Sequence, residues 1–339
     1  MGPSDGDVTL LVAGEPHRLT GGNLYNQHLC ASLISAGVDV AVVTAPPALY
    51  PRVAIVDSIS IAQSFSWIAA RPVRTAAVAL MHMLPSLHAT SGPARLRWRR
   101  LEMAFLRRVD LAVVVGQDLS RWLHRFGVAG PVHTIPPGKD GPRPRPGVAL
   151  GHQRKAGAGL RLLCVANWLP VKGLHVLIEA LADLPPDVRL DLVGDRAADP
   201  AYARQVREAM RRHRLEDRVR AAGVVPPGEM GARYAAVDAF VLPSGYEGYP
   251  TALAEALWFG LPVVATAVGG IPDLISGGVE GILVPPGRPR ALAGALRRLR
   301  DDPALRGRMA AAAAVRGQAL PSWADTRAAL RELLLSLLS

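Results

Sequence analysis

The amino-acid sequence predicts an α/β fold made of two Rossmann-like, doubly wound domains, each built on a parallel sheet. The chain has 339 residues, which suits two domains of roughly 150 residues better than a single core. In both halves, short apolar runs bounded by turn residues alternate with helical patterns, as buried parallel strands do. The alternation stops at Pro136–Gly159, which is dense in Pro, Gly and basic residues and has no apolar period. Such a composition is typical of an interdomain linker.

Six runs in each half are predicted to be strands. Those of the first half are Val8–Ala13, Val38–Thr44, Val53–Asp57, Thr75–Met81, Leu111–Val115 and Val132–Ile135. Those of the second half are Leu160–Ala166, Val188–Val193, Val219–Ala222, Ala239–Leu242, Val263–Thr266 and Gly281–Val284. Ligands of doubly wound sheets bind beyond the carboxyl ends of the strands, so the site residues are expected in the loops that follow strands.

The domain boundaries follow from these runs and from two helix-start signals. We expect a first domain over residues 1–142, a linker over 143–159 and a second domain over 160–320. Thr251 precedes a helical pattern that ends at Gly260, and Ser322 precedes another whose apolar residues share one face. This last helix, over 321–339, is expected to pack back toward the first domain.

Composition limits the compartment and the classes of partner. Half of the residues are hydrophobic and 20% are charged, as in a folded enzyme. The two cysteines, Cys30 and Cys164, form no C-x-x-C pair, and neither a secretory signal nor an apolar run long enough to span a membrane is visible. We therefore expect a cytoplasmic protein. The net charge of +11 has three readings: solvated arginines, an anionic membrane surface or an anionic substrate. No motif supports nucleic acid as a partner.

The segment Pro243–Ala256 carries two glutamates eight residues apart, Glu247 in a turn after a strand and Glu255 inside the following helix. The free amides at the start of that helix, Tyr249–Ala252, form a ready site for a phosphate. Carboxylates on either side of a bound diphosphate can accept hydrogen bonds from sugar and ribose hydroxyls. Taken alone, the pair is also compatible with two surface glutamates near a helix start.

Further residues in three segments of the chain have chemistry that suits an anionic sugar ligand. Gly21 and Gly22 lie between a strand and a helix, where glycine lets the backbone approach an anion. Lys172 is predicted to start a helix after a strand, as a mobile charge for a phosphate. His82 follows an apolar strand and is either a site residue or a core histidine, with His88 as a weaker candidate. Each of these positions is also compatible with a purely structural role.

In order along the chain, several segments resemble the family-four retaining glycosyltransferases, which have the GT-B fold of two Rossmann-like domains facing across a cleft. Glu247 and Glu255 are similar to the Glu-x7-Glu motif of that family. The matching segments are Thr20–Thr44, Ile135–Asp140, Val165–Leu181 and Glu247–Ile275. The resemblance implies transfer of a sugar, with retention, from a nucleoside-diphosphate sugar to an acceptor hydroxyl on a natural product, glycan or lipid.

The resemblance also implies a role for individual residues. Glu247 and His82 would face the donor sugar as catalytic residues, and Glu255 would bind the ribose. The remaining donor-binding residues would be Gly22, Lys172, Tyr249, Pro250 and Thr251. Many relatives have an arginine where this chain has Asn167, so either Lys172 acts with less help or an arginine such as Arg196 takes over. No metal is expected, because no D-x-D pair lies in a loop at a strand end.

Two rival functions and one surface helix complete the predictions. A nucleotide-sugar epimerase of the same architecture and a non-catalytic partner protein would share this fold. Walker A, G-x-S-x-G and G-x-G-x-x-G motifs are absent, which weakens other enzyme classes. Residues 93–109 form a basic amphipathic helix pattern with Trp98 and Phe105. It is either a membrane contact at the inner membrane face or a core-packed helix with a solvated basic face.

Overall fold

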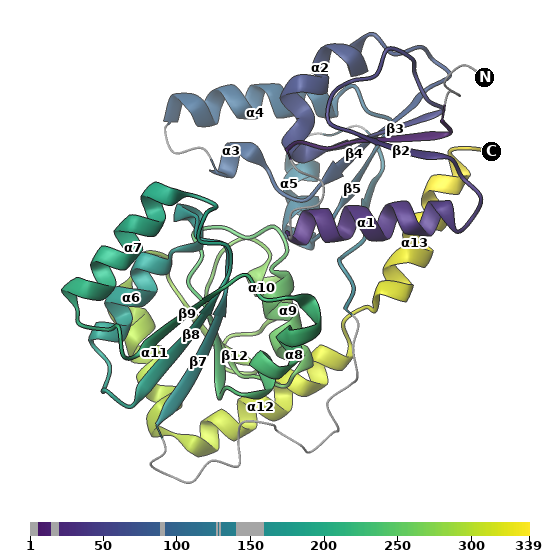
Figure 1. The fold of residues 1–339 in the computed structure, drawn as a ribbon. Coiled ribbons are helices and arrows are strands. Elements are labelled where there is room, and N and C mark those ends of the chain that lie inside the picture. The colour runs from purple at the N-terminus through teal and green to yellow at the C-terminus, as the bar shows by residue number, and fades with distance from the viewer. Residues whose placement is uncertain (1–5, 15–19, 89–91, 127, 129, 140–158) are drawn as a thin grey trace. The chain divides into compact units, whose positions relative to one another are not determined.

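A computed structural model describes residues 6–14, 20–88, 92–126, 128, 130–139 and 159–339. The chain forms two compact units, one comprising Met1–Gly138 and Pro321–Ser339 and the other Lys139–Leu320. The predicted linker, residues 143–159, lies outside the described residues except for Gly159. Each unit is an α/β structure around one sheet (Figure 1).

The first unit contains a six-stranded parallel sheet in the order β2-β1-β3-β4-β5-β6. Its strands are β1 (Val8–Leu11), β2 (Val40–Val43), β3 (Val53–Asp57), β4 (Ala76–Met81), β5 (Leu111–Val114) and β6 (Val132–Thr134). Its helices are α1 (Gly21–Ile34), η1 (Ser58–Ser60), α2 (Ile61–Ala69), α3 (Pro85–His88), α4 (Gly92–Leu106) and α5 (Gln117–Arg125), and the chain end adds α13 (Trp323–Ser336).

The second unit repeats this plan with the strand order β12-β11-β10-β7-β8-β9. Its strands are β7 (Leu160–Val165), β8 (Val188–Val193), β9 (Val219–Gly223), β10 (Ala239–Leu242), β11 (Val263–Thr266) and β12 (Gly281–Val284). Its helices are η2 (Pro170–Lys172), α6 (Leu174–Ala182), α7 (Pro200–Arg212), α8 (Pro227–Ala235), α9 (Thr251–Trp258), α10 (Ile271–Leu274), α11 (Pro289–Asp301) and α12 (Pro303–Gln318).

Strand alternation divides the core of the second unit into two layers, one on each face of its sheet. Leu162 and Cys164 of β7 belong to one buried cluster, which also takes residues from α6, α7 and α11. Leu163, between them, belongs to the other cluster, with residues from α8, α9 and α10. Successive strand residues point to opposite faces, so a strand buried on both faces is apolar throughout. This is the physical reason for the continuous apolar runs in the sequence.

The last helix, α13, packs beside α1 within the first unit (Figure 1). Ser322 and Asp325 form a capping box at its start, as the helix-start signal at Ser322 predicts. Trp323 stacks on His28 of α1 with a ring-centroid distance of 3.8 Å, and the Thr326 hydroxyl donates to the Pro136 carbonyl at 2.9 Å. These contacts attach the C-terminal helix to the sheet-bearing part of the same unit.

All twelve predicted strands are present, with ends that differ by at most two residues. Two local predictions are wrong. Lys172 does not start a helix: it ends the short 3-10 turn η2, and α6 begins at Leu174 after Gly173 adopts a left-handed conformation. Thr251 is not the cap of α9 but its first residue, and Pro250 occupies the capping position without a side-chain hydrogen bond.

Candidate active site

A partly buried ion pair joins Lys172, which follows β7, to Glu247, which follows β10. The Lys172 ammonium nitrogen lies 2.8 Å from one carboxylate oxygen of Glu247 and 2.9 Å from the other. The Glu247 side chain is 8% exposed and that of Lys172 is 25% exposed. The strands β7 and β10 are hydrogen-bonded neighbours in the sheet, so their carboxyl ends bring together two residues that are 75 positions apart. Both residues come after the carboxyl ends of their strands, Lys172 at the end of η2 and Glu247 before α9.

The Glu247 loop is held by its neighbours. Ser244 donates its hydroxyl to Glu247 Oε1 at 2.6 Å, and its own carbonyl accepts from Thr266 at 2.5 Å. The Gly270 amide donates to the Glu247 carbonyl at 2.8 Å. These bonds fix both the backbone and the carboxylate, so Glu247 has a defined orientation before any ligand arrives. The sequence reasoning missed Ser244, although it lies three residues before Glu247.

The start of α9 provides backbone donors directly after this loop. The amides of Leu253 and Ala254 both donate to the Pro250 carbonyl, whereas no described residue accepts from the amides of Thr251 or Ala252. No side chain caps this end of the helix. An uncapped helix start with free amides and a positive dipole end suits an anion. Tyr249 lies beside it, and burial raises the pKa of its phenol to about 12.

Glu255 lies inside α9 and bonds to Tyr234 of α8, whose hydroxyl donates to Glu255 Oε2 at 2.7 Å. Burial raises the pKa of the Glu255 carboxyl above its ordinary value, and the Tyr234 hydrogen bond opposes that change. The pKa of Tyr234 is also raised, first by burial and then by the Glu255 charge. No sequence pattern pointed to Tyr234, because it meets Glu255 only through the tertiary contact between α8 and α9.

Replacing Glu255 with glutamine should stabilise the protein without ligand at neutral pH. A carboxyl with a raised pKa binds its proton more tightly in the folded state, so its ionisation costs stability as pH rises through the folded pKa. The Tm of Glu255→Gln should therefore exceed that of the unmodified protein at pH 7, and the difference should shrink toward pH 4. Thermal unfolding across this range measures it. Glu208→Gln, on an exposed part of α7, is the control, and an equal gain there would contradict the explanation.

Asn167 has a structural role at the end of β7. Its side-chain oxygen accepts from the Asp195 amide at 3.0 Å and so joins the loop after β7 to the loop after β8. Arg196 follows in that second loop and lines a pocket of about 500 Å³ together with Arg207 and Gly223. Arg196 therefore lies in the loop after β8, which the Asn167 hydrogen bond joins to the loop after β7.

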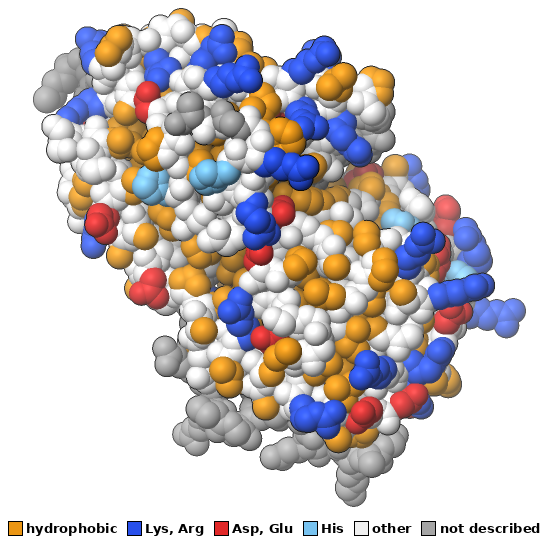
Figure 2. All heavy atoms as spheres, turned by 180° about the vertical axis from the view of Figure 1, so that it is seen from behind, with side chains coloured by type: hydrophobic (Ala, Val, Ile, Leu, Met, Phe, Trp, Pro, Cys, Tyr) orange, Lys and Arg blue, Asp and Glu red, His pale blue; other side chains and the backbone are white. Residues whose placement is uncertain are grey.

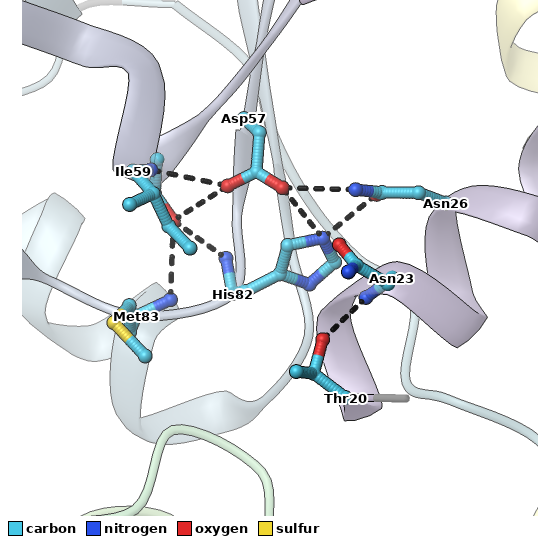
Figure 3. A network of polar contacts seen from close by, with 8 residues as sticks. Thr20, Asn23, Asn26, Asp57, Ile59, His82 and Met83 are labelled. Atoms are coloured by element: carbon cyan, nitrogen blue, oxygen red, sulfur yellow. Dashed lines mark hydrogen bonds and ion pairs between the residues drawn. The ribbon is translucent and has the colours of Figure 1, made fainter. Parts of the chain in front are cut away.

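In the first unit, His82, directly after β4, lies against Gly22 at the start of α1. A Cβ atom placed on Gly22 would lie 3.3 Å from the His82 ring, so glycine lets the start of α1 approach the imidazole closely. His82 Nε2 lies 2.9 Å from Asn26 Oδ1 and 3.5 Å from Asp57 Oδ2 (Figure 3). Burial lowers the pKa of His82, and the Asp57 charge opposes this.

The sequence reasoning missed Asn26 and Asp57. Asp57 ends β3, a position from which site residues are expected, and this signal could have found it. Asn26 lies within α1 and gives no such signal. His88, the weaker histidine candidate, ends α3, and its side chain lies outside the described part of the structure. Among the described residues, no group of three or more His, Cys, Asp or Glu side chains is arranged to hold a metal ion.

The basic helix pattern corresponds to α4, which buries Glu102, Phe105 and Leu106 and exposes most of its arginines. Within the described ranges, no helix has the length and apolarity that a membrane crossing requires. On the face drawn in Figure 2, basic side chains are scattered among hydrophobic and uncharged surface.

Comparison with known proteins shows which family and which folds this chain resembles. Residues 152–316 match the family described as glycosyl transferases group 1. The D-inositol 3-phosphate glycosyltransferase of Xylanimonas cellulosilytica is 30% identical over 233 residues, which are 66% of this chain and 53% of that protein. The curated relatives are longer: the matched regions cover between 34% and 56% of their length.

Two solved structures share the fold over nearly the whole chain. Sucrose-phosphate synthase from Thermosynechococcus elongatus has a TM-score of 0.82 at 23% identity, covering 97% of this chain and 98% of that one. Anabaena HepE in complex with UDP-glucose has a TM-score of 0.76 at 21% identity, covering 97% and 99%. The predicted α/β fold class, GT-B with two Rossmann-like parallel-sheet domains, is confirmed.

Proposed function

Because residues 152–316 match the family described as glycosyl transferases group 1, we propose that this chain is a retaining, metal-independent glycosyltransferase. Its donor is a nucleoside-diphosphate sugar and its acceptor carries a hydroxyl. The observation that carries the proposal is the Lys172–Glu247 ion pair in the loops next to the uncapped start of α9. A cation, a fixed carboxylate and free amides are the groups that a diphosphate sugar requires.

In the proposed reaction, the bond between the anomeric carbon and the phosphate oxygen breaks, and the electron pair stays on that oxygen. The acceptor hydroxyl oxygen bonds to the anomeric carbon on the same face and loses its proton to the leaving phosphate. The transition state has a positively charged sugar ring and a negatively charged phosphate, as in glycoside chemistry generally. Lys172 and the amides of Thr251 and Ala252 stabilise the phosphate, and Glu247 stabilises the ring.

Three further residues contact the donor in this proposal. Glu255, held by Tyr234 at 2.7 Å, accepts hydrogen bonds from ribose hydroxyls. Gly22 offers its amide to the distal phosphate, and His82 faces the donor sugar. The solved structure of Anabaena HepE holds UDP-glucose, which supports a nucleotide sugar as the class of donor. The acceptor belongs to the classes given above: a natural product, a glycan or a lipid.

A screen of nucleotide sugars tests the proposal. Each donor is incubated with the protein, with and without a mixture of hydroxyl acceptors and with a chelator present, and the products are separated by mass. Transfer predicts nucleoside diphosphate released together with a glycosylated acceptor. A changed sugar on an intact nucleotide, formed without any acceptor, would instead identify an epimerase. The curated relatives matched here are named as glycosyltransferases.

The proposal includes contact with an anionic membrane through α4, where an acceptor lipid would reside. Leu96 is 52% exposed, and Arg97 and Arg100 lie beside it on exposed positions. Basic and apolar side chains together favour anionic lipid surfaces. Sedimentation with anionic vesicles should carry the protein down, and Arg97→Glu with Arg100→Glu should release most of it. As a control, the α7 double variant Arg204→Glu with Arg207→Glu should bind the vesicles as well as the unmodified protein does. If the α4 double variant also bound as well as the unmodified protein, this contact would be contradicted.

A further inference from the structure

The hydrogen bonds around His82 determine which ring nitrogen carries its proton. Asp57 is buried and accepts from the Asn26 amide nitrogen at 2.9 Å and from the Ile59 amide at 3.1 Å (Figure 3). A carboxylate accepts only, so the Asn26 amide nitrogen must face Asp57. The Asn26 oxygen is therefore left to face His82 Nε2, at 2.9 Å.

Both neighbours of His82 Nε2 are consequently acceptors. Asn26 Oδ1 lies at 2.9 Å and Asp57 Oδ2 at 3.5 Å. A neutral imidazole has one N–H and one lone pair, so this environment requires the hydrogen on Nε2 and leaves the lone pair on Nδ1. Nδ1 has no described partner, and Figure 3 shows it on the side of the ring away from Asp57 and Asn26.

The ring is also held in place by packing. Tyr25 meets it edge to face, with ring centroids 5.2 Å apart, and the Tyr25 hydroxyl donates to the Ile135 carbonyl at 2.9 Å. The Ser58 hydroxyl oxygen accepts from the His82 amide at 3.3 Å and from the Met83 amide at 3.4 Å. Tyr25 and Ser58 thus hold the position of His82, whereas Asn26 and Asp57 determine its tautomer.

We propose that Asn26 and Asp57 are positioning residues that hold His82 with its proton on Nε2, so that Nδ1 accepts a hydrogen bond from a substrate hydroxyl. This inference rests on the proposed function, in which His82 faces the donor sugar. A lone pair on Nδ1 favours a hydroxyl at that position and disfavours a carboxylate, which has no proton to donate. The arrangement thereby contributes to the selection of the sugar.

Asp57→Asn gives the proposal a distinctive outcome. The new amide nitrogen would face Asn26 as a donor, so Asn26 would turn its oxygen toward position 57 and its nitrogen toward His82. Nε2 would then have to accept, and the proton of His82 would move to Nδ1. A residue that only supported the fold would not invert the tautomer.

Long-range ¹H–¹⁵N spectra of the full chain labelled with ¹⁵N-histidine measure this without any ligand. The chain has nine histidines, and His82→Asn identifies the signals of His82 by their loss. At pH 7 we expect the proton on Nε2 in the unmodified protein, on Nδ1 in Asp57→Asn, and on Nε2 in the control Ser58→Ala. A proton on Nδ1 in the unmodified protein overturns the proposal even if the variants fail to fold. An unchanged tautomer in Asp57→Asn overturns it as well.

Activity gives the second readout. With the donor found by the screen above, Asp57→Asn should lower kcat/KM about tenfold or more, because Nδ1–H would then donate to the substrate hydroxyl and the hydroxyl's own proton would lose its acceptor. Unchanged kcat/KM in a variant with the inverted tautomer would overturn the role of Nδ1. The spectra require no donor, so failure of the tautomer assignment and failure of glycosyl transfer are separate results.

Discussion

Lys172→Ala should lower the rate of sugar transfer by roughly 10²- to 10³-fold, the usual loss when one group that stabilises transition-state charge is removed. Lys172 is the charge closest to Glu247, with both distances under 3 Å. In the proposed reaction, its ammonium group stabilises the leaving phosphate. The fall should appear in kcat as well as in kcat/KM, since the phosphate gains negative charge only as the bond breaks. Steady-state kinetics with the donor identified by screening measure both.

Two controls separate chemistry from folding. Removing Lys172 leaves the buried Glu247 carboxylate with Ser244 as its remaining side-chain partner, which costs stability as well as activity. The double variant Lys172→Ala, Glu247→Gln removes that unpaired charge and should regain stability but not rate. Arg204→Ala, which removes an exposed cation from α7, should keep the full rate. If Lys172→Ala retained near-normal turnover, Lys172 would have no role in phosphate stabilisation.

Gly173→Ala should lower the free energy of unfolding by about 3 kcal/mol, because two penalties act together. Gly173 has φ of 64°, a left-handed conformation that alanine adopts at a cost. A Cβ atom there would also overlap with the carbonyl oxygen of Pro243. Pro243 begins the loop that carries Glu247, so relief of the overlap would displace both sides of the ion pair. The free energy of unfolding, measured by chemical denaturation, and the turnover rate should therefore both fall.

Gly294→Ala is the matched control for this substitution. Gly294 lies inside α11, and nothing lies within 4 Å of a Cβ atom placed on it. Alanine is a better helix former than glycine, so this variant should gain roughly 0.5–1 kcal/mol and keep its activity. If Gly173→Ala lowered the free energy of unfolding no more than an ordinary surface substitution does, the loop that carries Glu247 would adjust to the added methyl group, contrary to this prediction.

The sequence predicts the strands well because buried strands require apolar residues at consecutive or alternate positions, a pattern visible within a few residues. Val53–Asp57 is apolar except for its last residue, and Val188–Val193 alternates apolar residues with Arg189 and Asp191; both have the predicted bounds. Helix starts were less predictable. Thr251 has a residue type that often caps helices, yet Pro250 takes that position. Lys172 ends a 3-10 turn because Gly173 reverses the chain before α6. Such details depend on backbone angles that the apolar pattern does not encode.

The site was predictable as a set of positions but not as a set of contacts. The turn and helix around Glu247 identified one carboxylate near a phosphate site, and the resemblance supplied its roles. The partners of these residues come from elsewhere in the chain. Tyr234 reaches Glu255 from another helix, and Asn26 reaches Asp57 across 31 positions. No local pattern marks contacts of this kind, because the tertiary fold alone brings the two residues together.

The most direct test of the central proposal is the anomeric configuration of the product. With the donor selected by screening, NMR of the glycosylated acceptor reports whether the new bond lies on the same face of the sugar as the bond to phosphate. Retention of configuration, with one nucleoside diphosphate released for each product formed and almost no product from Lys172→Ala, is the predicted result. An inverted product, or equal transfer by Lys172→Ala and the unmodified protein, would contradict it.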